Sequence, residues 1–442
     1  MKFLESILKP TILMIPSWYP STENPHNGSF FREQALALSV NFNFIVIKPK
    51  TIKELDFIYK IKSLIGYNKP QLDFIQNDEG IQEFAFHFKI PTPSTLGRVI
   101  NLLNKMKAHL LSKLMYQHTK TTASCHPQIR FGKQLTINNA RHYAIDYLKK
   151  QNLLPHFDCV YSLTMQDMVS LGNDFAEIYS VPHITAEHAP FPWPGKVLDD
   201  YTVQSIEKAD AFLAISNDKI RQVLLQNIKI NPIYWVGNLC DDTKFTLSME
   251  KHSIPTFLIV ASHSFYKNYP LFVKSMEELK RIATKPFNII IAGYDANPGY
   301  SQNTHELEQL VKQSTISENT TLIRTVSREN MPQLYNTCDV FILTSIQEGM
   351  PVCALEASMS GLPIITTQCG GVEDYIDESM GRIFPITDYL GIAQACNSYL
   401  EGELKFAPPT IIREKAIRLF GKQSFVNNVT NIFYNVLNKS KE

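Results

Sequence analysis

The stretch SIQEGMPVCALEASMSGLPIITTQCGGVEDYI, residues 345–376, decides the fold that we expect for this chain. It follows VFILTS (340–345), an apolar run typical of a buried strand, and leads through a glycine–proline turn into the helical segment VCALEASMSG. Another apolar run, PIITTQ (363–368), comes directly after that helix. A strand, a helix and a further buried strand in this order predict an α/β protein with a parallel sheet covered by helices.

The same stretch places two carboxylates, Glu348 and Glu356, where a ligand can reach them. Glu348 follows a strand at its carboxyl end, where open parallel sheets bind ligands. Gly349 leaves room for a close approach, and Met350 and Pro351 lead into the first helical turn, whose N–H groups suit anionic oxygens. Glu356 lies about one and a half turns into the helix. Two carboxylates placed in this way can accept hydrogen bonds from the hydroxyls of a sugar nucleotide.

Strand-like runs alternate with helical patterns along most of the chain, and their number exceeds what one doubly wound sheet usually holds. We therefore expect two Rossmann-like domains, 1–245 and 246–442, because the polar segment 240–255 lacks periodicity and closes on a proline. The predicted strands are TILMIPSW (11–18), NFIVIKP (43–49), CVYSL (159–163), PHITAEH (182–188), AFLAIS (211–216), IYWVGN (233–238), TFLIVAS (256–262), FNIIIAG (287–293), TLIRTV (321–326), VFILTS and PIITTQ. Residues 51–130 do not follow the alternation.

Composition narrows the class of protein. The 442 residues are 44% hydrophobic and 19% charged, as in a globular protein of two or three domains. No apolar run reaches the ~18 residues that a membrane-spanning helix needs. The amino-terminal residues carry Glu5 and Lys9 and lack a small-residue cleavage site, so we expect a cytoplasmic protein. Seven scattered cysteines without a Cys-x-x-Cys pair favour buried, reduced thiols.

One basic stretch stands out from the net charge of +1. No Asp or Glu occurs from Phe84 to Ile145, which indicates either an anionic partner or a solvated face balanced elsewhere in the fold. Within it, apolar residues at helical spacing are flanked by Arg98, Lys105 and Lys113. Such a helix can lie on an anionic membrane surface, or it can simply face the core with a wet edge. The apolar stripe comprises Leu96, Val99, Leu103, Met106, Leu110 and Leu114.

Missing motifs exclude several chemistries. The chain has no Asp-x-Asp pair to clamp a divalent metal, no Gly-x-Gly-x-x-Gly and no P-loop. We therefore expect neither a metal nor a dinucleotide cofactor. His183 and His188 lie five residues apart on a predicted strand, which does not match the spacing of helix-borne zinc ligands.

The stretch 345–376 resembles the donor-site signature of the family-4 retaining glycosyltransferases, because Glu-x7-Glu is followed by SGLPIITT and by Gly-Gly before an acidic residue. The resemblance implies a GT-B fold, in which two doubly wound parallel-sheet domains face each other across a cleft. The amino-terminal domain would bind the acceptor and the carboxyl-terminal domain the donor. It also implies that the last helix, about 423–438, packs back towards the amino-terminal domain.

The resemblance extends to the amino-terminal half. MIPSWYPSTENPHNGSFFREQALAL looks like the family's first strand, glycine loop and first helix, with Gly28 in the loop. TAEHAPF looks like the strand end that presents a histidine, here His188. His188 would then bind the donor sugar or the acceptor, although an ordinary strand-end histidine is the alternative. Residues 51–130 are not covered by the resemblance.

The diphosphate site departs from the family's usual pattern. Lys267 matches a lysine that follows the first strand of the carboxyl-terminal domain and would stabilise the leaving diphosphate, unless it is only a solvated loop residue. Ser262 stands where arginine is usual, with His263 beside it. Arg324 or His263 are candidates to replace that arginine, and we include Val326, at the end of TLIRTV, among the donor-binding residues.

The resemblance implies transfer of a hexose-type unit from a nucleoside diphosphate sugar, with retention of configuration and without metal. A glycan or a lipid-diphosphate-linked acceptor in cell-surface polysaccharide synthesis is the expected setting, with a possible contact to the inner face of a membrane and no nucleic-acid partner. Two alternatives remain: a sugar-nucleotide epimerase of the same fold, and an inert homologue that acts as a binding partner.

Overall fold

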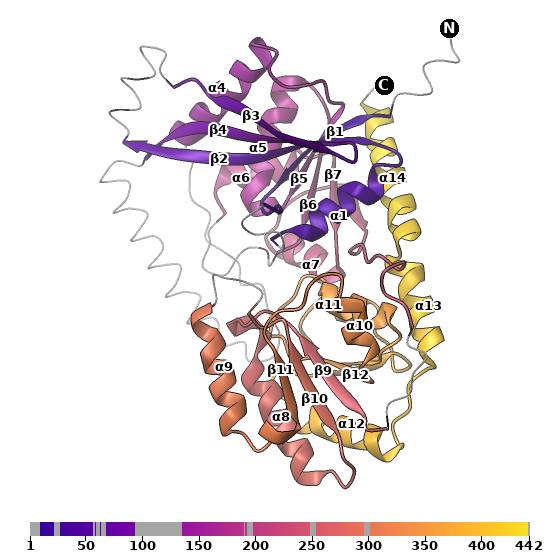
Figure 1. Cartoon of the computed structure of the whole chain (residues 1–442). Helices are drawn as coiled ribbons and strands as arrows, with labels where there is room; N and C mark the ends of the chain where they lie inside the picture. Colours follow the sequence, from indigo (N-terminus) through magenta and orange to yellow (C-terminus); the bar gives the residue numbers. More distant parts are fainter. Residues whose placement is uncertain are drawn as a thin grey trace. The chain divides into compact units, whose positions relative to one another are not determined.

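The computed structural model describes residues 9–21, 27–55, 58, 62, 68–92, 135–189, 191, 198–247, 253–295 and 301–440 (Figure 1). Contacts divide the chain into two compact units, Met1–Val236 with Val426–Glu442, and Gly237–Phe425. The boundary after Val236 falls before residue 245, where the sequence analysis placed the end of the first domain. Each unit is built around its own sheet, so the prediction of two Rossmann-like α/β domains is confirmed.

The first unit contains a sheet with the strand order β3-β4-β2-β1-β5-β6-β7-β8. Its neighbouring strands are parallel except for the antiparallel pair of β3 and β4. The strands are β1 (Thr11–Pro16), β2 (Asn43–Leu55), β3 (Gln71–Asp78), β4 (Ile81–Thr92), β5 (Cys159–Leu163), β6 (His183–Glu187), β7 (Ala211–Ala214) and β8 (Ile233–Trp235).

The β3–β4 hairpin corrects the expectation that residues 51–130 are irregular, because it occupies residues 71–92 within that range. Phe84, Phe86 and Phe88 alternate along β4 and are all buried in the core. This two-residue period is the ordinary signal of a strand with one buried face. The hairpin was missed because a search for strand–helix alternation does not expect two consecutive strands.

Helices cover both faces of this sheet. On one face, α4 (Leu135–Lys150) and α5 (Met165–Tyr179) pack against β1, β2, β4 and β5 in a shared core. Farther along the sheet, α6 (Asp200–Glu207) and α7 (Asn217–Leu225) close a second core with β7. On the opposite face, Tyr161, which alternates with the core residue Val160, contacts Phe433 of α14 (Lys422–Lys439). Phe433 also contacts Phe42, so this part of α14 is a component of the first unit.

The second unit contains a parallel sheet with the strand order β11-β10-β9-β12-β13-β14. The chain runs outward from β9 to β11 and then returns to the other side of β9 with β12. The border between β9 and β12 is therefore the point at which the winding direction reverses. The strands are β9 (Thr256–Val260), β10 (Asn288–Ala292), β11 (Thr320–Ile323), β12 (Val340–Leu343), β13 (Ile364–Thr367) and β14 (Gly381–Phe384).

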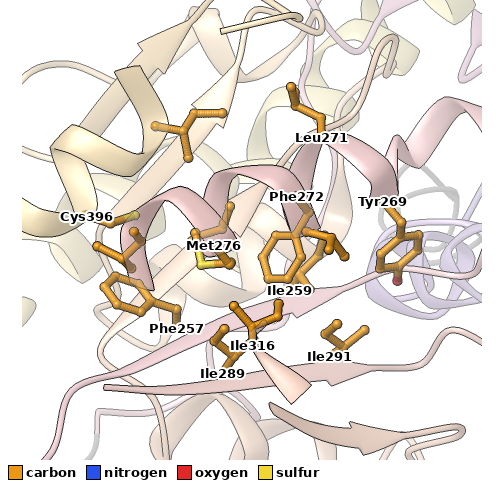
Figure 2. Close-up of a cluster of buried hydrophobic side chains, with 14 of the residues drawn as sticks. Phe257, Ile259, Tyr269, Leu271, Phe272, Met276, Ile289, Ile291, Ile316 and Cys396 are labelled. Carbon is orange, nitrogen blue, oxygen red and sulfur yellow. The ribbon is translucent and has the colours of Figure 1, made fainter. Parts of the chain in front are cut away.

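Figure 2 shows the core beneath one face of the second sheet, where Phe257, Ile259 and Ile289 meet Phe272 and Met276 of α8 (Tyr269–Ile282). α9 (Ser301–Gln313) and α12 (Tyr389–Glu401) contribute to the same core. The opposite face carries α10 (Met331–Asn336) and α11 (Val352–Met359), and α13 (Pro409–Phe420) packs on α11. In the described part of the chain, no helix has the length and apolar character required to cross a membrane.

Candidate functional site

Lys267 and Glu348 form an ion pair at the reversal point of the second sheet. Lys267 ends a 3-10 turn, Phe265–Lys267, that follows β9, and Glu348 lies in the loop that follows β12. The Lys267 Nζ and Glu348 Oε1 atoms are 2.6 Å apart. The two loops follow neighbouring strands and meet at the carboxyl edge, which is where open α/β sheets bind ligands. The structure thus brings together two residues that lie 81 positions apart in the sequence.

Neighbouring hydrogen bonds fix the orientation of the Glu348 carboxylate. Ser345 Oγ donates to Glu348 Oε1 at 2.6 Å, and the Glu348 backbone N–H donates to the Cys369 carbonyl at 2.6 Å. On the other side, Thr344 Oγ1 donates to the Lys267 carbonyl at 3.1 Å. The loops after β9, β12 and β13 are therefore tied to one another by hydrogen bonds that hold the pair in place.

Both charges of this pair remain accessible. The Lys267 side chain is 20% exposed and that of Glu348 is 13% exposed. Burial on its own would lower the pKa of Lys267, but the adjacent Glu348 carboxylate outweighs burial and raises that pKa above its ordinary value. Lys267 therefore stays protonated at neutral pH and can attract an anionic group.

The start of α11 lies beside this pair and is built on close backbone contacts. Pro351 occupies the position just before the helix, not the first helical turn that the sequence suggested, and no side chain caps this end. Asn238 Nδ2 donates to the Met350 carbonyl at 3.0 Å. Gly371 has φ +75°, and a Cβ there would lie 2.3 Å from the Gly349 carbonyl oxygen. The second glycine of the Gly-Gly motif is therefore required for the loops to meet.

Glu356 lies deeper than the sequence suggested. Its side chain is only 3% exposed and forms an ion pair with Arg328, while Tyr335 Oη donates to its Oε2 at 3.0 Å. We did not select Arg328 from the sequence, although it follows a predicted strand by two residues. Val326 lies beyond the end of β11, in the same loop as Arg328 and not in a strand.

The two candidates to replace the missing arginine at Ser262 have other roles. Arg324 makes two hydrogen bonds to Glu308, with distances of 2.7 and 3.0 Å. The His263 ring stacks on Tyr269 with centroids 5.3 Å apart. Burial lowers the pKa of His263, although Glu306 acts in the opposite direction, so this imidazole is neutral at physiological pH. Ser262 itself lies in the loop after β9 and is partly exposed.

His188 lies directly after β6 in the first unit. Its ring centroid is 5.7 Å from that of Phe30 and 4.9 Å from that of Phe31. Both ring nitrogens are shielded from solvent and have no hydrogen-bond partner among the described residues. Burial, with a further contribution from Lys219, lowers the pKa of His188 to about 3. His188 is therefore a neutral imidazole in an aromatic setting.

Gly28 belongs to the same part of the first unit, because it immediately precedes α1 (Ser29–Leu38), the helix that carries Phe30 and Phe31. Gly28 has φ +68°, and a Cβ there would lie 2.6 Å from the backbone of Trp18. Only glycine fits this turn without moving the chain. The glycine loop and the histidine predicted from the sequence are thus connected through the first turn of α1.

The remaining residues discussed from the sequence are His183, the possible metal ligands and the basic segment. His183 is buried and its Nε2 lies 2.8 Å from Ser162 Oγ, which gives it a structural hydrogen bond. No group of three or more His, Cys, Asp or Glu side chains suited to a metal ion occurs in the described ranges. The proposed membrane-facing residues Arg98, Lys105 and Lys113 lie outside the described residues.

Comparisons with known proteins found similar chains, and the relatives reported below are named as glycosyltransferases or sugar-linking synthases. Residues 245–418 match the model of the family described as glycosyl transferases group 1. The chain is 23% identical over 315 residues to the N-acetyl-alpha-D-glucosaminyl L-malate synthase of Bacillus anthracis, which covers 68% of this chain and 75% of that protein. It is 27% identical over 169 residues to the N,N'-diacetylbacillosaminyl-diphospho-undecaprenol alpha-1,3-N-acetylgalactosaminyltransferase of Campylobacter jejuni, covering 38% of this chain and 40% of that one.

Among solved structures, the sucrose-phosphate synthase of Thermosynechococcus elongatus superimposes with a TM-score of 0.66 over 98% of this chain and 100% of that one, at 13% identity. At that identity the likeness shows the GT-B fold alone. These relatives give no support to the epimerase alternative. The family match over residues 245–418, the named relatives and the shared fold together show that this chain is a glycosyltransferase, and that its residues 245–418 are similar to the group 1 glycosyltransferases.

Proposed function

We propose that this glycosyltransferase moves a hexose-type unit from a nucleoside diphosphate sugar to a lipid-diphosphate-linked or glycan acceptor, with retention of configuration and without a metal ion. The observation that carries the proposal is the Lys267–Glu348 pair, with its 2.6 Å contact at the reversal point of the second sheet and beside the uncapped start of α11. A cation, a helix amino terminus and a carboxylate at one edge of the sheet suit an anionic ligand that also carries hydroxyl groups.

The charges assign distinct roles to these groups. The Lys267 ammonium stabilises the negative charge that develops on the leaving diphosphate, and the amino end of α11 adds its dipole to the same task. Glu348, held by Ser345, accepts hydrogen bonds from the hydroxyls of the donor sugar. We assign no protein nucleophile, because departure and attack on the same face of the sugar need none.

The acceptor side of the proposal rests on different support. The Campylobacter jejuni relative is named for an acceptor linked to diphospho-undecaprenol. The basic stretch from Phe84 to Ile145 suits such an anionic, membrane-bound substrate, because each basic residue near an anionic surface adds about 1 kcal/mol to binding. We therefore place the enzyme at the cytoplasmic face of a membrane, in cell-surface polysaccharide synthesis.

Transfer assays test the donor and acceptor classes. Purified protein is incubated with UDP-, GDP- and ADP-sugars, each with and without an undecaprenyl-diphosphate-linked sugar, and the new linkage is read by NMR. We expect acceptor-dependent transfer from one nucleotide class with retained configuration. Nucleotide binding without transfer to any acceptor would instead support the inert homologue.

Liposome binding tests the membrane surface. We expect wild-type protein to bind anionic liposomes at low salt, and the triple variant Arg98→Glu, Lys105→Glu, Lys113→Glu to be released from them. Transfer to a short soluble acceptor should change little in the triple variant. Equal loss of both activities would assign the segment a folding role.

A further inference from the structure

Phe265 is the most exposed large hydrophobic residue in the part of the chain that the structure describes. It lies in the 3-10 turn after β9, two residues before Lys267, and it is 76% exposed. The next most exposed, Phe74 of β3, is 59% exposed and packs edge-on against Phe84, with ring centroids 5.4 Å apart. An apolar ring that adds little to folding is therefore held in solvent beside the lysine that we propose binds the diphosphate.

Hydrogen bonds hold this turn against the loop that carries Glu348. The Ile346 N–H donates to the Tyr266 carbonyl at 2.7 Å, and the Asn268 N–H donates to the Phe265 carbonyl at 3.2 Å. The Tyr266 ring meets the Phe265 ring edge-on, with centroids 5.7 Å apart. Since its backbone is fixed and a phenylalanine has only two side-chain torsions, Phe265 loses little freedom when a ligand packs on it.

The exposed fractions indicate which ligand group this ring can meet. The Lys267 and Glu348 side chains are 20% and 13% exposed, and in the proposed function they hold the diphosphate and the donor sugar. Phe265 is far more exposed, so a group that packs on it lies farther out than either of these. The acceptor approaches the donor sugar from the solvent side, because Lys267 and Glu348 hold the donor from the protein side. The acceptor is therefore the ligand that this ring is placed to meet.

The chemistry of an aromatic face suits a sugar ring. A pyranose has a face made mainly of C–H groups, whose small positive charge is attracted by the negative face of an aromatic ring. Polar residues border the ring, since Ser264 and Asn268 are both partly exposed. A surface that enters a membrane usually carries several apolar side chains together. A single aromatic ring among polar neighbours therefore favours a saccharide over a lipid surface.

We propose that Phe265 is an acceptor-binding residue, whose ring stacks on the C–H face of the terminal sugar of the acceptor. The inference rests on the proposed function and adds that the acceptor presents a saccharide ring, and not only a lipid diphosphate, to the Gly237–Phe425 unit. Removing the ring should leave the fold intact, because an exposed side chain outside the core contributes little to stability. Loss of acceptor binding can therefore be measured without loss of the protein.

The test compares acceptors with and without a sugar. The acceptors are farnesyl diphosphate linked to N-acetylglucosamine, galactose or glucose, whichever accepts transfer from the wild type, and farnesyl diphosphate itself is the competitor that lacks the sugar. We expect Phe265→Ser to raise the KM of the sugar-linked acceptor about tenfold, the loss typical of one aromatic stacking contact. Inhibition by farnesyl diphosphate should be unchanged, and so should hydrolysis of the donor in the absence of acceptor.

Further variants separate stacking from a general apolar contact. Phe265→Trp keeps a flat ring, so we expect a KM near that of the wild type. Phe265→Leu keeps apolar surface without the flat face, and its KM should be closer to that of Phe265→Ser than to that of the wild type. Phe74→Ser is the matched control, because it removes an exposed phenylalanine from the first unit, and it should leave the KM unchanged. Anionic liposomes should bind Phe265→Ser and the wild type alike.

Several results would overturn the inference. An unchanged acceptor KM in Phe265→Ser would give the ring no role in acceptor binding, and a raised KM for the donor would place it at the donor. Equal losses for the sugar-linked acceptor and for farnesyl diphosphate would place it against the prenyl chain, and release from anionic liposomes would place it in the membrane. If the wild type transfers sugar to none of the acceptors, the proposed function with a lipid-linked acceptor itself fails, which is distinguishable from wild-type transfer that Phe265→Ser leaves intact.

Discussion

The carboxyl edges of the two sheets carry opposite kinds of chemistry. In the Gly237–Phe425 unit the edge presents Lys267 and Glu348, two charged side chains that are paired and partly exposed. In the first unit the edge presents His188, which is neutral and packed against Phe30 and Phe31. A charged edge suits a phosphate-bearing ligand, whereas a neutral aromatic edge suits an uncharged, hydroxyl-bearing group. The same architecture thus presents two different edges, and the side chains decide which kind of ligand each edge would suit.

The largest expected effect comes from removing the cation of the charged edge. Lys267→Met should lower kcat about 100-fold or more, the size of effect seen when a group that stabilises transition-state charge is lost. Steady-state kinetics at saturating donor measure it, and Lys312→Met, an exposed change on α9, is the control. An equal loss of activity in both variants would show that Lys267 has no specific role in catalysis.

A smaller loss should follow from neutralising the acid of the same edge. Glu348→Gln keeps the shape of the side chain but removes the charge that we propose accepts hydrogen bonds from the donor sugar, so kcat should fall about ten- to a hundred-fold. Circular dichroism should show an unchanged fold, because the carboxylate lies at a partly open surface. The exposed Glu318→Gln serves as the control, and near-normal turnover by Glu348→Gln would remove Glu348 from the site.

The neutral edge predicts a pH effect on stability. The pKa of His188 is lowered to about 3, so the folded state stays uncharged while the unfolded state takes up a proton below about pH 6.5. The resulting stability is present above pH 6.5 and is lost as the pH falls towards 3. From pH 7 to pH 5 the loss is about 2 kcal/mol for such a histidine.

His188→Gln should therefore lose less stability than the wild type over that pH range. Urea unfolding followed by tryptophan fluorescence suits this test, because all three tryptophans of the sequence precede Gly237, where the second unit begins. An equal loss in both proteins would show that His188 titrates normally and that this edge is not neutral.

The smallest expected effect concerns metal. Activity should persist in excess EDTA, because Lys267 and the start of α11 supply the positive charge for the diphosphate. The measurement compares initial rates with and without EDTA. Loss of activity that manganese or magnesium restores would contradict the metal-free proposal and would add a third charge to the charged edge.

The sequence predicted those features that depend on local patterns. Apolar runs bounded by turn residues predicted β1, β5, β9 and β12 to within a few residues, and the position of Glu348 after such a run predicted its place at the sheet edge. The pairing of Lys267 with Glu348 required the strand order, because their strands become neighbours only when the sheet forms. Neither the local patterns nor the resemblance to a known family predicted this contact, which the structure shows.

Features that depend on packing between distant parts of the chain could not be predicted from the sequence. The exposure of Glu356 was overestimated because helical spacing gives the direction of a side chain but not what lies above it, here Arg328. The neutrality of His188 arises from burial against side chains of α1, which are distant in sequence. The β3–β4 hairpin shows the converse, since its alternating phenylalanines were visible in the sequence but did not fit the expected topology.

The contact between Lys267 and Glu348 also affects how readily free phosphate could bind beside Lys267. A bare lysine beside a helix amino terminus would collect any free phosphate, and cells contain much of it. Here the Glu348 carboxylate is paired with the Lys267 ammonium, so another anion must compete with Glu348 for Lys267. Inorganic phosphate brings no hydroxyl-rich sugar to satisfy the displaced carboxylate, whereas a sugar nucleotide brings a partner for both groups. If Lys267 binds the diphosphate as we propose, the pair would act as an internal competitor that favours a sugar nucleotide over free phosphate.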